Sequence, residues 1–275
     1  YLNRVITTDT TSTYFAAIKR GKLGVITPIF DSSIKFNAND TLTAFGLTTT
    51  AVFRDPTSWL FIHVSNGGLY VNGVSYGAVT TSSITNMRIG YDGTNYADMY
   101  IARIGVVGGS SSAYTNFGYF NTEINEWVSK SQAQVKAIVD AGGTNSFMLD
   151  FDDGSSLTTL GYDKSSKGNN WTLNNFSLTP GVNYDWMLDV PGNSFATLNP
   201  LSKGPSVTMS EGNLSYSQAA ASHISQPTSQ SVSSGKWYAE VVITATGGTY
   251  PSVGIATSAN QITTEFIGQS ATSWG

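Results

Sequence analysis

The stretch Leu69-Tyr70-Val71-Asn72-Gly73-Val74-Ser75-Tyr76 gives the clearest indication of the fold. Asn-Gly is the preferred pair for the tightest hairpin turn, because both of its residues readily adopt positive φ. Apolar and β-branched residues flank the pair on both sides, as they do in strands. We therefore expect a β-hairpin here, preceded by a second turn at Asn66-Gly67-Gly68.

Further strand-like runs extend from this hairpin in both directions. In 32–37 the apolar residues alternate, which places Ile34 and Phe36 on one face of a strand. Other runs of strand character lie at 14–19, 59–64, 87–90, 99–107 and 147–151. One helix is expected over 132–140, with Ser131 as its N-cap and Gly142 as its stop. We expect this helix to cap one open end of the sheets.

The composition agrees with a folded β protein. The chain has 275 residues, of which 40% are hydrophobic and 12% aromatic, so it differs from disordered chains, which are poor in hydrophobic residues. Charged residues make up only 12%, about half the usual share. The net charge is −4, without the basic footprint that nucleic-acid binding needs. We expect no nucleic-acid partner.

Other compositional features exclude further classes of protein. Cysteine is absent, which excludes disulfides, thiolate zinc sites and a cysteine nucleophile. The sequence contains no continuous apolar run of the length that spans a bilayer, so we expect no membrane insertion.

The chain divides into three parts by composition. Residues 1–163 hold the strand-like runs, and residues 164–205 form a connector rich in Ser, Asn, Gly and Pro. The connector carries large aromatic residues that a flexible linker would leave exposed, so we expect them to pin it to its neighbours. Residues 206–275 form a second β segment whose strands would leave an open edge. We therefore expect the polypeptide to extend beyond Gly275, and also upstream of Tyr1.

Two sets of motifs resemble known β-sandwich families. Trp59-Leu60-Phe61-Ile62-His63-Val64, the hairpin described above and Met87-Arg88-Ile89-Gly90 resemble the concanavalin A-like jelly roll of laminin-G and pentraxin type. Gly235-Lys236-Trp237-Tyr238-Ala239-Glu240-Val241, with 253–256 and 273–275, resembles the first part of a SPRY domain. The resemblance implies an all-β chain: a jelly-roll β-sandwich over 1–163, followed by an incomplete SPRY-like β-sandwich over 206–275.

The connector itself carries a third resemblance. Gly168-Asn169-Asn170-Trp171-Thr172-Leu173-Asn174-Asn175-Phe176-Ser177 is similar to a segment that joins such sandwiches in large proteins of tailed bacteriophages. The resemblance implies a virion protein, such as a tail fibre or tail spike on the virion surface. It also implies other virion proteins as partners and a homo-oligomer, with a trimer favoured.

Three functions remain open at this stage. The leading hypothesis is a non-enzymatic appendage that recognises a host surface glycan or protein. The second is an architectural role, as a capsid decoration or fibre collar that binds other virion proteins. The third is a polysaccharide depolymerase whose active site lies outside this sequence.

Glycan binding needs an aromatic face for the sugar ring and polar groups for its hydroxyls. Tyr91, Asp92, Asn95 and Tyr96 supply both within six positions, and we take them as candidate ligand-binding residues. The alternative for this loop is an ordinary hairpin turn.

A second group of aromatic residues is interpreted mainly as packing between subunits or domains, with glycan binding as the alternative for those at 114–120. Its members are Tyr114, Phe117, Tyr119, Phe120, Trp171 and Phe176.

Catalytic and metal-binding patterns are weak. The chain has only His63 and His223, and His63 lies in an apolar run where a structural role is favoured. No Gly-x-Ser-x-Gly motif is present, and no catalytic residues are assigned. Asp150, Asp152 and Asp153 form the single weak candidate for calcium, with an acidic turn after a strand as the alternative. No other cofactor is expected.

Overall fold

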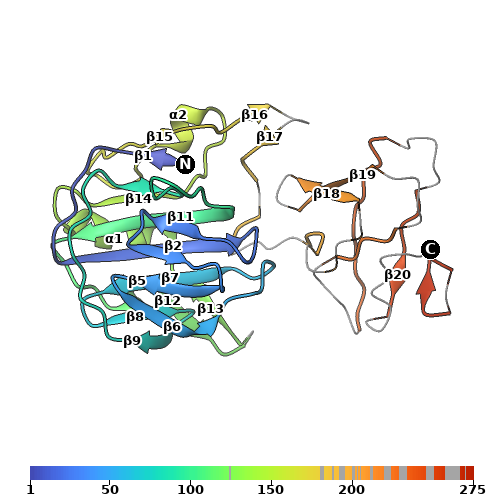
Figure 1. Cartoon of the computed structure of the whole chain (residues 1–275), viewed down its shortest axis with the longest axis horizontal. Coiled ribbons are helices and arrows are strands. Elements are labelled where there is room, and N and C mark those ends of the chain that lie inside the picture. The colour runs from blue at the N-terminus through green and yellow to red at the C-terminus, as the bar shows by residue number, and fades with distance from the viewer. Residues whose placement is uncertain are drawn as a thin grey trace. The chain divides into compact units, whose positions relative to one another are not determined.

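The computed structural model describes two compact units, Tyr1–Ser194 and Phe195–Gly275, which are treated separately below (Figure 1). Regular structure in the described residues is almost entirely β, with two short α-helices, α1 (Gln132–Ala141) and α2 (Leu157–Leu160). The description covers the whole chain except residues 124, 180–182, 188, 192–195, 200–201, 203, 205, 211–212, 220–223, 229–233, 246–250, 258–266 and 270.

The first unit is a sandwich of two antiparallel sheets. Sheet A has the strand order β15-β1-β10-β3-β4-β5-β6, and sheet B has the order β14-β11-β2-β7-β8-β9. The strands of sheet A are β15 (Thr172–Leu173), β1 (Leu2–Asn3), β10 (Arg88–Ile89), β3 (Thr27–Phe30), β4 (Ile34–Phe36), β5 (Thr41–Ala44) and β6 (Leu47–Val52). Those of sheet B are β14 (Phe147–Leu149), β11 (Met99–Gly108), β2 (Ser12–Arg20), β7 (Leu60–Ser65), β8 (Gly68–Val71) and β9 (Val74–Gly77).

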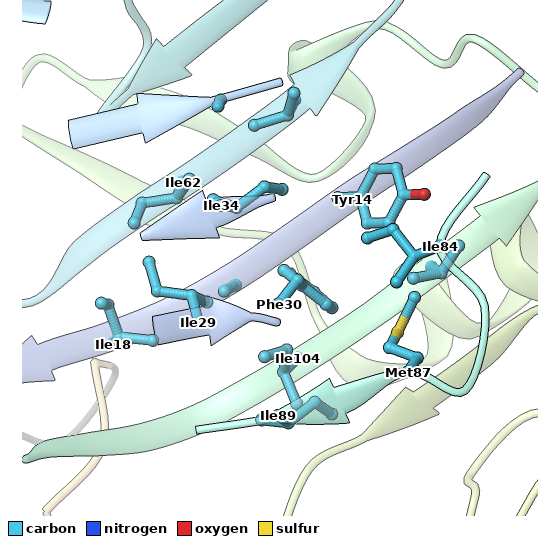
Figure 2. Close-up of a cluster of buried hydrophobic side chains, with 14 of the residues drawn as sticks. Tyr14, Ile18, Ile29, Phe30, Ile34, Ile62, Ile84, Met87, Ile89 and Ile104 are labelled. Carbon is cyan, nitrogen blue, oxygen red and sulfur yellow. The ribbon is translucent and has the colours of Figure 1, made fainter. Parts of the chain in front are cut away.

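The main core lies between the two sheets. Alternate residues of β2, such as Tyr14 and Ile18, meet Phe30 and Ile34 of sheet A in a buried cluster (Figure 2). Side chains alternate between the two faces of a strand, so the residues between them, such as Phe15, face away from this core. The expected all-β sandwich is confirmed.

The Asn-Gly hairpin is present as expected. Asn72 and Gly73 have φ values of 49° and 77°, and Val71 pairs with Val74 across the turn between β8 and β9. The turn at Asn66-Gly67 likewise joins β7 to β8. The strand runs inferred from periodicity also correspond to β2, β4, β7, β10, β11 and β14.

Two hairpins were not anticipated. β5 and β6 are joined at Phe45-Gly46, where the bulky Phe45 adopts a positive φ of 45°. β12 (Gly118–Asn121) and β13 (Glu126–Ser129) form a separate two-stranded ribbon in a region that was interpreted only as an aromatic cluster. Neither turn contains an Asn-Gly pair. The β5–β6 turn uses Phe45-Gly46, and the β12–β13 connection between Asn121 and Glu126 is longer.

Helix α1 begins and ends close to the expected residues, but it does not cap an open end of the sheets. Ser131 and Gln134 form a capping box at its start, and Gly142 follows its end. Its buried residues, Val135 and Val139, pack with Phe15, Val107 and Met148 on the outer face of sheet B. The helix therefore buries apolar residues that sheet B directs away from the main core.

Three aromatic residues of the connector, Trp171, Phe176 and Trp186, pack within the first unit, and Phe195 lies outside the described residues. Trp171 is 5% exposed, and its ring lies 4.7 Å from that of Phe147. Phe176 is partly buried against the same core, and β15 pairs with β1. The Trp186 indole donates a hydrogen bond to the carbonyl of Phe151. The first unit accordingly extends through Ser194, beyond the jelly-roll boundary expected at 163.

The described part of the second unit contains two short antiparallel pairs. One joins β18 (Val207–Ser210) to β19 (Ser215–Gln218), and the other joins β20 (Ile255–Ala256) to β21 (Ser273–Trp274). Residues 236–245 lie outside these strands and are exposed. The SPRY-like assignment of this unit stays a prediction.

Candidate functional site

A small pocket lies on the outer face of sheet B, beneath the β12–β13 ribbon and the short 3-10 turn Tyr114–Asn116. It leaves about 30 Å³ of space. We call it the aromatic pocket, and five ring-bearing residues define it: His63, Tyr70, Tyr114, Phe117 and Trp127.

The rings of the aromatic pocket are in mutual contact. Tyr70 and Tyr114 stack with their centroids 4.2 Å apart and an interplanar angle of 18°. Trp127 lies 5.5 Å from Tyr114, and His63 lies 5.3 Å from Phe117. Tyr70, Tyr114 and Trp127 are half-buried, whereas His63 and Phe117 are buried. The first three therefore form the accessible part of the pocket, and the other two form its base.

Trp127 is held in place by two glycines. A Cβ atom on Gly73 would lie 2.5 Å from the Trp127 ring, and one on Gly118 would lie 2.4 Å from its Nε1. Both distances are shorter than any normal van der Waals contact, so the indole fits only because these positions lack side chains. The Asn-Gly turn thus serves two purposes: it reverses the chain and makes room for Trp127.

His63 has hydrogen-bonding capacity that the protein does not use. It is 5% exposed, and neither ring nitrogen has a hydrogen-bond partner among the described residues. Burial lowers the pKa of His63 to about 4, an effect that the nearby backbone of Ser112 partly offsets. The imidazole is therefore neutral at neutral pH, with one nitrogen as a donor and the other as an acceptor.

Arg103 and Ser129, two polar residues of the lining, are already paired. Arg103 donates to both carboxylate oxygens of Asp150, and also to the Ser129 hydroxyl and the Lys130 carbonyl. The Ser129 hydroxyl in turn donates to the Lys130 carbonyl. No carboxylate occurs among the residues that line the pocket. The remaining polar groups of the lining are the hydroxyls of Tyr70 and Tyr114, the indole N–H of Trp127 and the buried imidazole of His63.

In the loop 91–96, which the sequence indicated as a ligand site, the polar groups largely hydrogen-bond to one another. Asp92 accepts hydrogen bonds from the backbone N–H groups of Thr94 and Asn95 and from the Asn95 side chain. Burial opposes ionisation of Asp92, but these hydrogen bonds outweigh it and lower its pKa. The rings of Tyr91 and Tyr96 stack on each other at 4.5 Å. Tyr96 is 59% exposed, so part of its ring remains accessible.

The three aspartates considered for calcium do not converge. Asp150 binds Arg103, Asp152 pairs with Lys164, and Asp153 accepts a hydrogen bond from the backbone of Ser155. Within the described residues, no group of three or more His, Asp or Glu side chains is placed to hold a metal ion. These carboxylates stabilise local structure instead.

The second aromatic group divides between two environments. Tyr114 and Phe117 belong to the aromatic pocket. Tyr119 and Phe120, on β12, are 49% and 51% exposed. His223 lies outside the described residues. The aromatic cluster at 114–120 therefore contributes to both a pocket and an exposed surface.

Sequence reasoning did not identify Tyr70 and Trp127 as site residues. A signal for Tyr70 was available, because the turn at Asn66-Gly67 sets the register in which His63 pairs with Tyr70. Trp127 pairs with Phe120 across the unanticipated β12–β13 ribbon. Without that ribbon, nothing in the sequence places Trp127 near Gly73.

Comparisons with protein-family models, curated proteins and solved structures find no match to this chain. Neither helix in the described part of the chain has the length and hydropathy needed to cross a membrane. Function is therefore inferred from the chemistry of the aromatic pocket, together with the resemblance of the sequence motifs.

Proposed function

We propose that this chain is a non-enzymatic recognition module of a tailed-bacteriophage virion appendage, and that it binds a host surface glycan. The virion assignment comes from the resemblance of the connector motif. The glycan assignment comes from the aromatic pocket, where half-buried Tyr70, Tyr114 and Trp127 lie beside the unpaired imidazole of His63. Sugar-binding sites combine these two features: aromatic faces and a few convergent polar groups.

The half-buried faces of Tyr70, Tyr114 and Trp127, gathered in one pocket, are the observation that carries this proposal. At loop 91–96 the polar groups already bind one another, so a ligand there would have to displace existing hydrogen bonds. At the aromatic pocket a ligand could lie against the rings without displacing these bonds. The proposed site is therefore the aromatic pocket rather than loop 91–96.

The lining of the pocket favours binding over cleavage. Glycoside hydrolysis ordinarily needs two carboxyl groups on opposite sides of the scissile bond. The pocket lining includes neither Asp nor Glu. Glu123 and Glu126 are exposed residues at the end of the β12–β13 ribbon. In a homotrimer, several such pockets would strengthen weak binding through avidity.

The proposal is tested by binding of the full chain to susceptible host cells, with purified surface polysaccharide as competitor and release of reducing sugar followed in parallel. We expect saturable binding that polysaccharide blocks, without sugar release. Trp127→Ala should reduce binding, whereas Tyr96→Ala should leave it within about twofold of wild type. The reverse pattern would move the site to loop 91–96, and sugar release would contradict the non-enzymatic assignment.

The exposed pair Tyr119 and Phe120 supports an alternative, architectural function. Large exposed aromatic residues are enriched at protein–protein interfaces. If this pair docks onto another virion protein, a Tyr119→Ser, Phe120→Ser double variant should fail to assemble into particles while its binding to polysaccharide is unchanged. A chain that enters virions but binds no host surface would favour this alternative.

A further inference from the structure

We infer that the buried ion pair between Lys19 and Asp189 is a latch, which holds a short strap of the connector on the outer face of sheet B, and that the strap can open without unfolding of the sandwich. The strap comprises residues 185–187 and 189 of the first unit. The inference does not depend on the glycan proposal. It follows from the surroundings of the ion pair, the position of Lys19 on β2 and the hydrogen bonding of the connector.

The ion pair is shielded from water. The side chains of Lys19 and Asp189 are 2% and 1% exposed. The Lys19 ammonium also lies 5.3 Å and 5.4 Å from the ring centroids of Trp59 and Tyr100. Burial, together with the charges of Asp98 and Asp189, raises the pKa of Tyr100 to about 12, which agrees with a site of low polarity. Removing either partner of the ion pair would leave the other as an uncompensated buried charge, which is strongly unfavourable.

The latch lies on the face of sheet B that carries the aromatic pocket. Side chains alternate along β2, so Phe15, Ala17 and Lys19 share its outer face. Phe15 and Ala17 line the pocket, and Lys19 occupies the next outward position. Tyr100 pairs with Lys19 across the β2–β11 ladder. Opening of the latch would therefore bring the ammonium and the neighbouring ring into contact with water beside the pocket.

The strap can leave this face without disturbing the sheets. Within the described residues, no strand pairing of either sheet includes it. At its start, the Asp185 N–H donates to the Ser177 carbonyl and the Ser177 N–H donates to the Asp185 carboxylate, so these bonds lie within the connector. Trp186 contacts the sandwich through its hydrogen bond to Phe151 and its fit against Gly154. A segment that is held by side chains but belongs to no sheet is of the kind that opens locally.

An ion pair suits this role because it selects one partner. Buried ion pairs add little net stability compared with apolar packing, but they can fix the register in which two segments dock. The other acidic residue of the strap, Asp185, is exposed and bound to Ser177. Lys19 therefore determines that the strap docks through Asp189.

The latch is tested by hydrogen exchange of the full chain, followed by mass spectrometry of its peptides. Lys19→Met keeps a long side chain but removes the ammonium, and should speed exchange in the strap about tenfold. Asp189→Asn removes the opposite charge with little change of shape and should act in the same direction. A Lys19→Met, Asp189→Leu double variant replaces the ion pair by apolar groups and should restore protection. Exchange in β3, β4 and β5 of sheet A should stay as in wild type in all three.

Lys136→Met provides the matched control. Lys136 forms an ion pair with Asp140 on α1, but its side chain is 40% exposed. Exposed ion pairs contribute little to stability, so this variant should exchange as wild type does in both the strap and sheet A.

Several results would overturn the inference. Unchanged exchange in the strap of both Lys19→Met and Asp189→Asn would show that the ion pair does not hold it. Faster exchange in sheet A as well as in the strap would show that the strap opens only when the sandwich unfolds. A double variant as open as Lys19→Met would show that the uncompensated charge is not the cause of opening. No sugar enters this measurement, so its failure would leave the glycan proposal standing.

Discussion

The aromatic pocket and loop 91–96 are both rich in aromatic and polar residues, yet they differ in how far those residues already bind one another. In loop 91–96, Asp92 and Asn95 satisfy each other and Tyr91 stacks on Tyr96. In the aromatic pocket, Tyr70, Tyr114 and Trp127 present half-buried rings, and the buried ring nitrogens of His63 have no hydrogen-bond partner in the part of the chain that the structure describes. The comparison teaches that residue types alone do not identify a binding site. Unused hydrogen-bonding capacity beside an accessible aromatic face is more informative, and it depends on the folded neighbourhood.

Glycine substitution should give the largest difference between the two regions. Gly73→Ala places a Cβ 2.5 Å from the Trp127 ring at a φ of 77°, so strain and overlap act together. We expect it to lower the free energy of unfolding by about 3 kcal/mol. Gly93→Ala has a similar positive φ, but its nearest contact is Arg88 at 3.4 Å. Gly93→Ala should lower the free energy of unfolding by about 1 kcal/mol, which reflects backbone strain alone.

Urea unfolding of the two variants measures this difference. A Gly73→Ala variant as stable as Gly93→Ala would show that Trp127 is free to move away from the Asn-Gly turn. The aromatic pocket would then lack the fixed wall that sugar stacking requires.

Acid should distinguish the pocket from the loop because their titratable groups, both with a lowered pKa, lose stability over different pH ranges. The pKa of His63 is about 4 in the folded chain and 6.5 in the reference state, so the unfolded chain binds the proton first as pH falls. Stability should therefore decrease from about pH 6.5 to pH 4, by about 3 kcal/mol in total.

The lowered pKa of Asp92 acts in the same direction as that of His63, but over a lower pH range. Its stabilising contribution is complete above the reference carboxyl pKa of 3.8 and is lost only as pH falls further. Unfolding free energies of wild type and His63→Phe, measured from pH 7 to pH 4.5, should thus differ in slope. Parallel curves would show that His63 is not held neutral by burial.

The smallest effect is expected from loop 91–96 itself. Asp92→Ala removes the acceptor for the N–H groups of Thr94 and Asn95, but these groups lie at the surface and can bind water instead. We expect a loss of about 1 kcal/mol in unfolding free energy and no change in glycan binding. Loss of binding in this variant, with stability preserved, would restore the loop as the ligand site.

Much of the sandwich could be predicted because its signals are local. Asn72-Gly73 specifies a turn by the positive φ of both residues, and Ser131 with Gln134 specifies the start of α1 by a capping box. The β5–β6 turn could not be predicted in this way. It uses Phe45 at positive φ, which local preference disfavours and tertiary packing enforces.

The position of α1 illustrates the same limit. Val135 and Val139 form its buried face, but their spacing in the sequence does not say what that face covers. The helix covers the outer face of sheet B because Phe15, Val107 and Met148 form an apolar surface there. Each of them alternates with core residues on a different strand. Strand pairing had to be known before that apolar surface could be recognised.

The sequence by itself determined the β class, the Asn-Gly hairpin and helix α1, because each follows from preferences of neighbouring residues. Only the tertiary structure decided where a ligand could bind. His63, Tyr70, Tyr114 and Trp127 come from β7, β8, a 3-10 turn and β13, and they meet through pairing and packing between distant segments. Whether a buried imidazole has a partner depends on all of those segments at once. Local sequence patterns do not reveal whether such a partner exists.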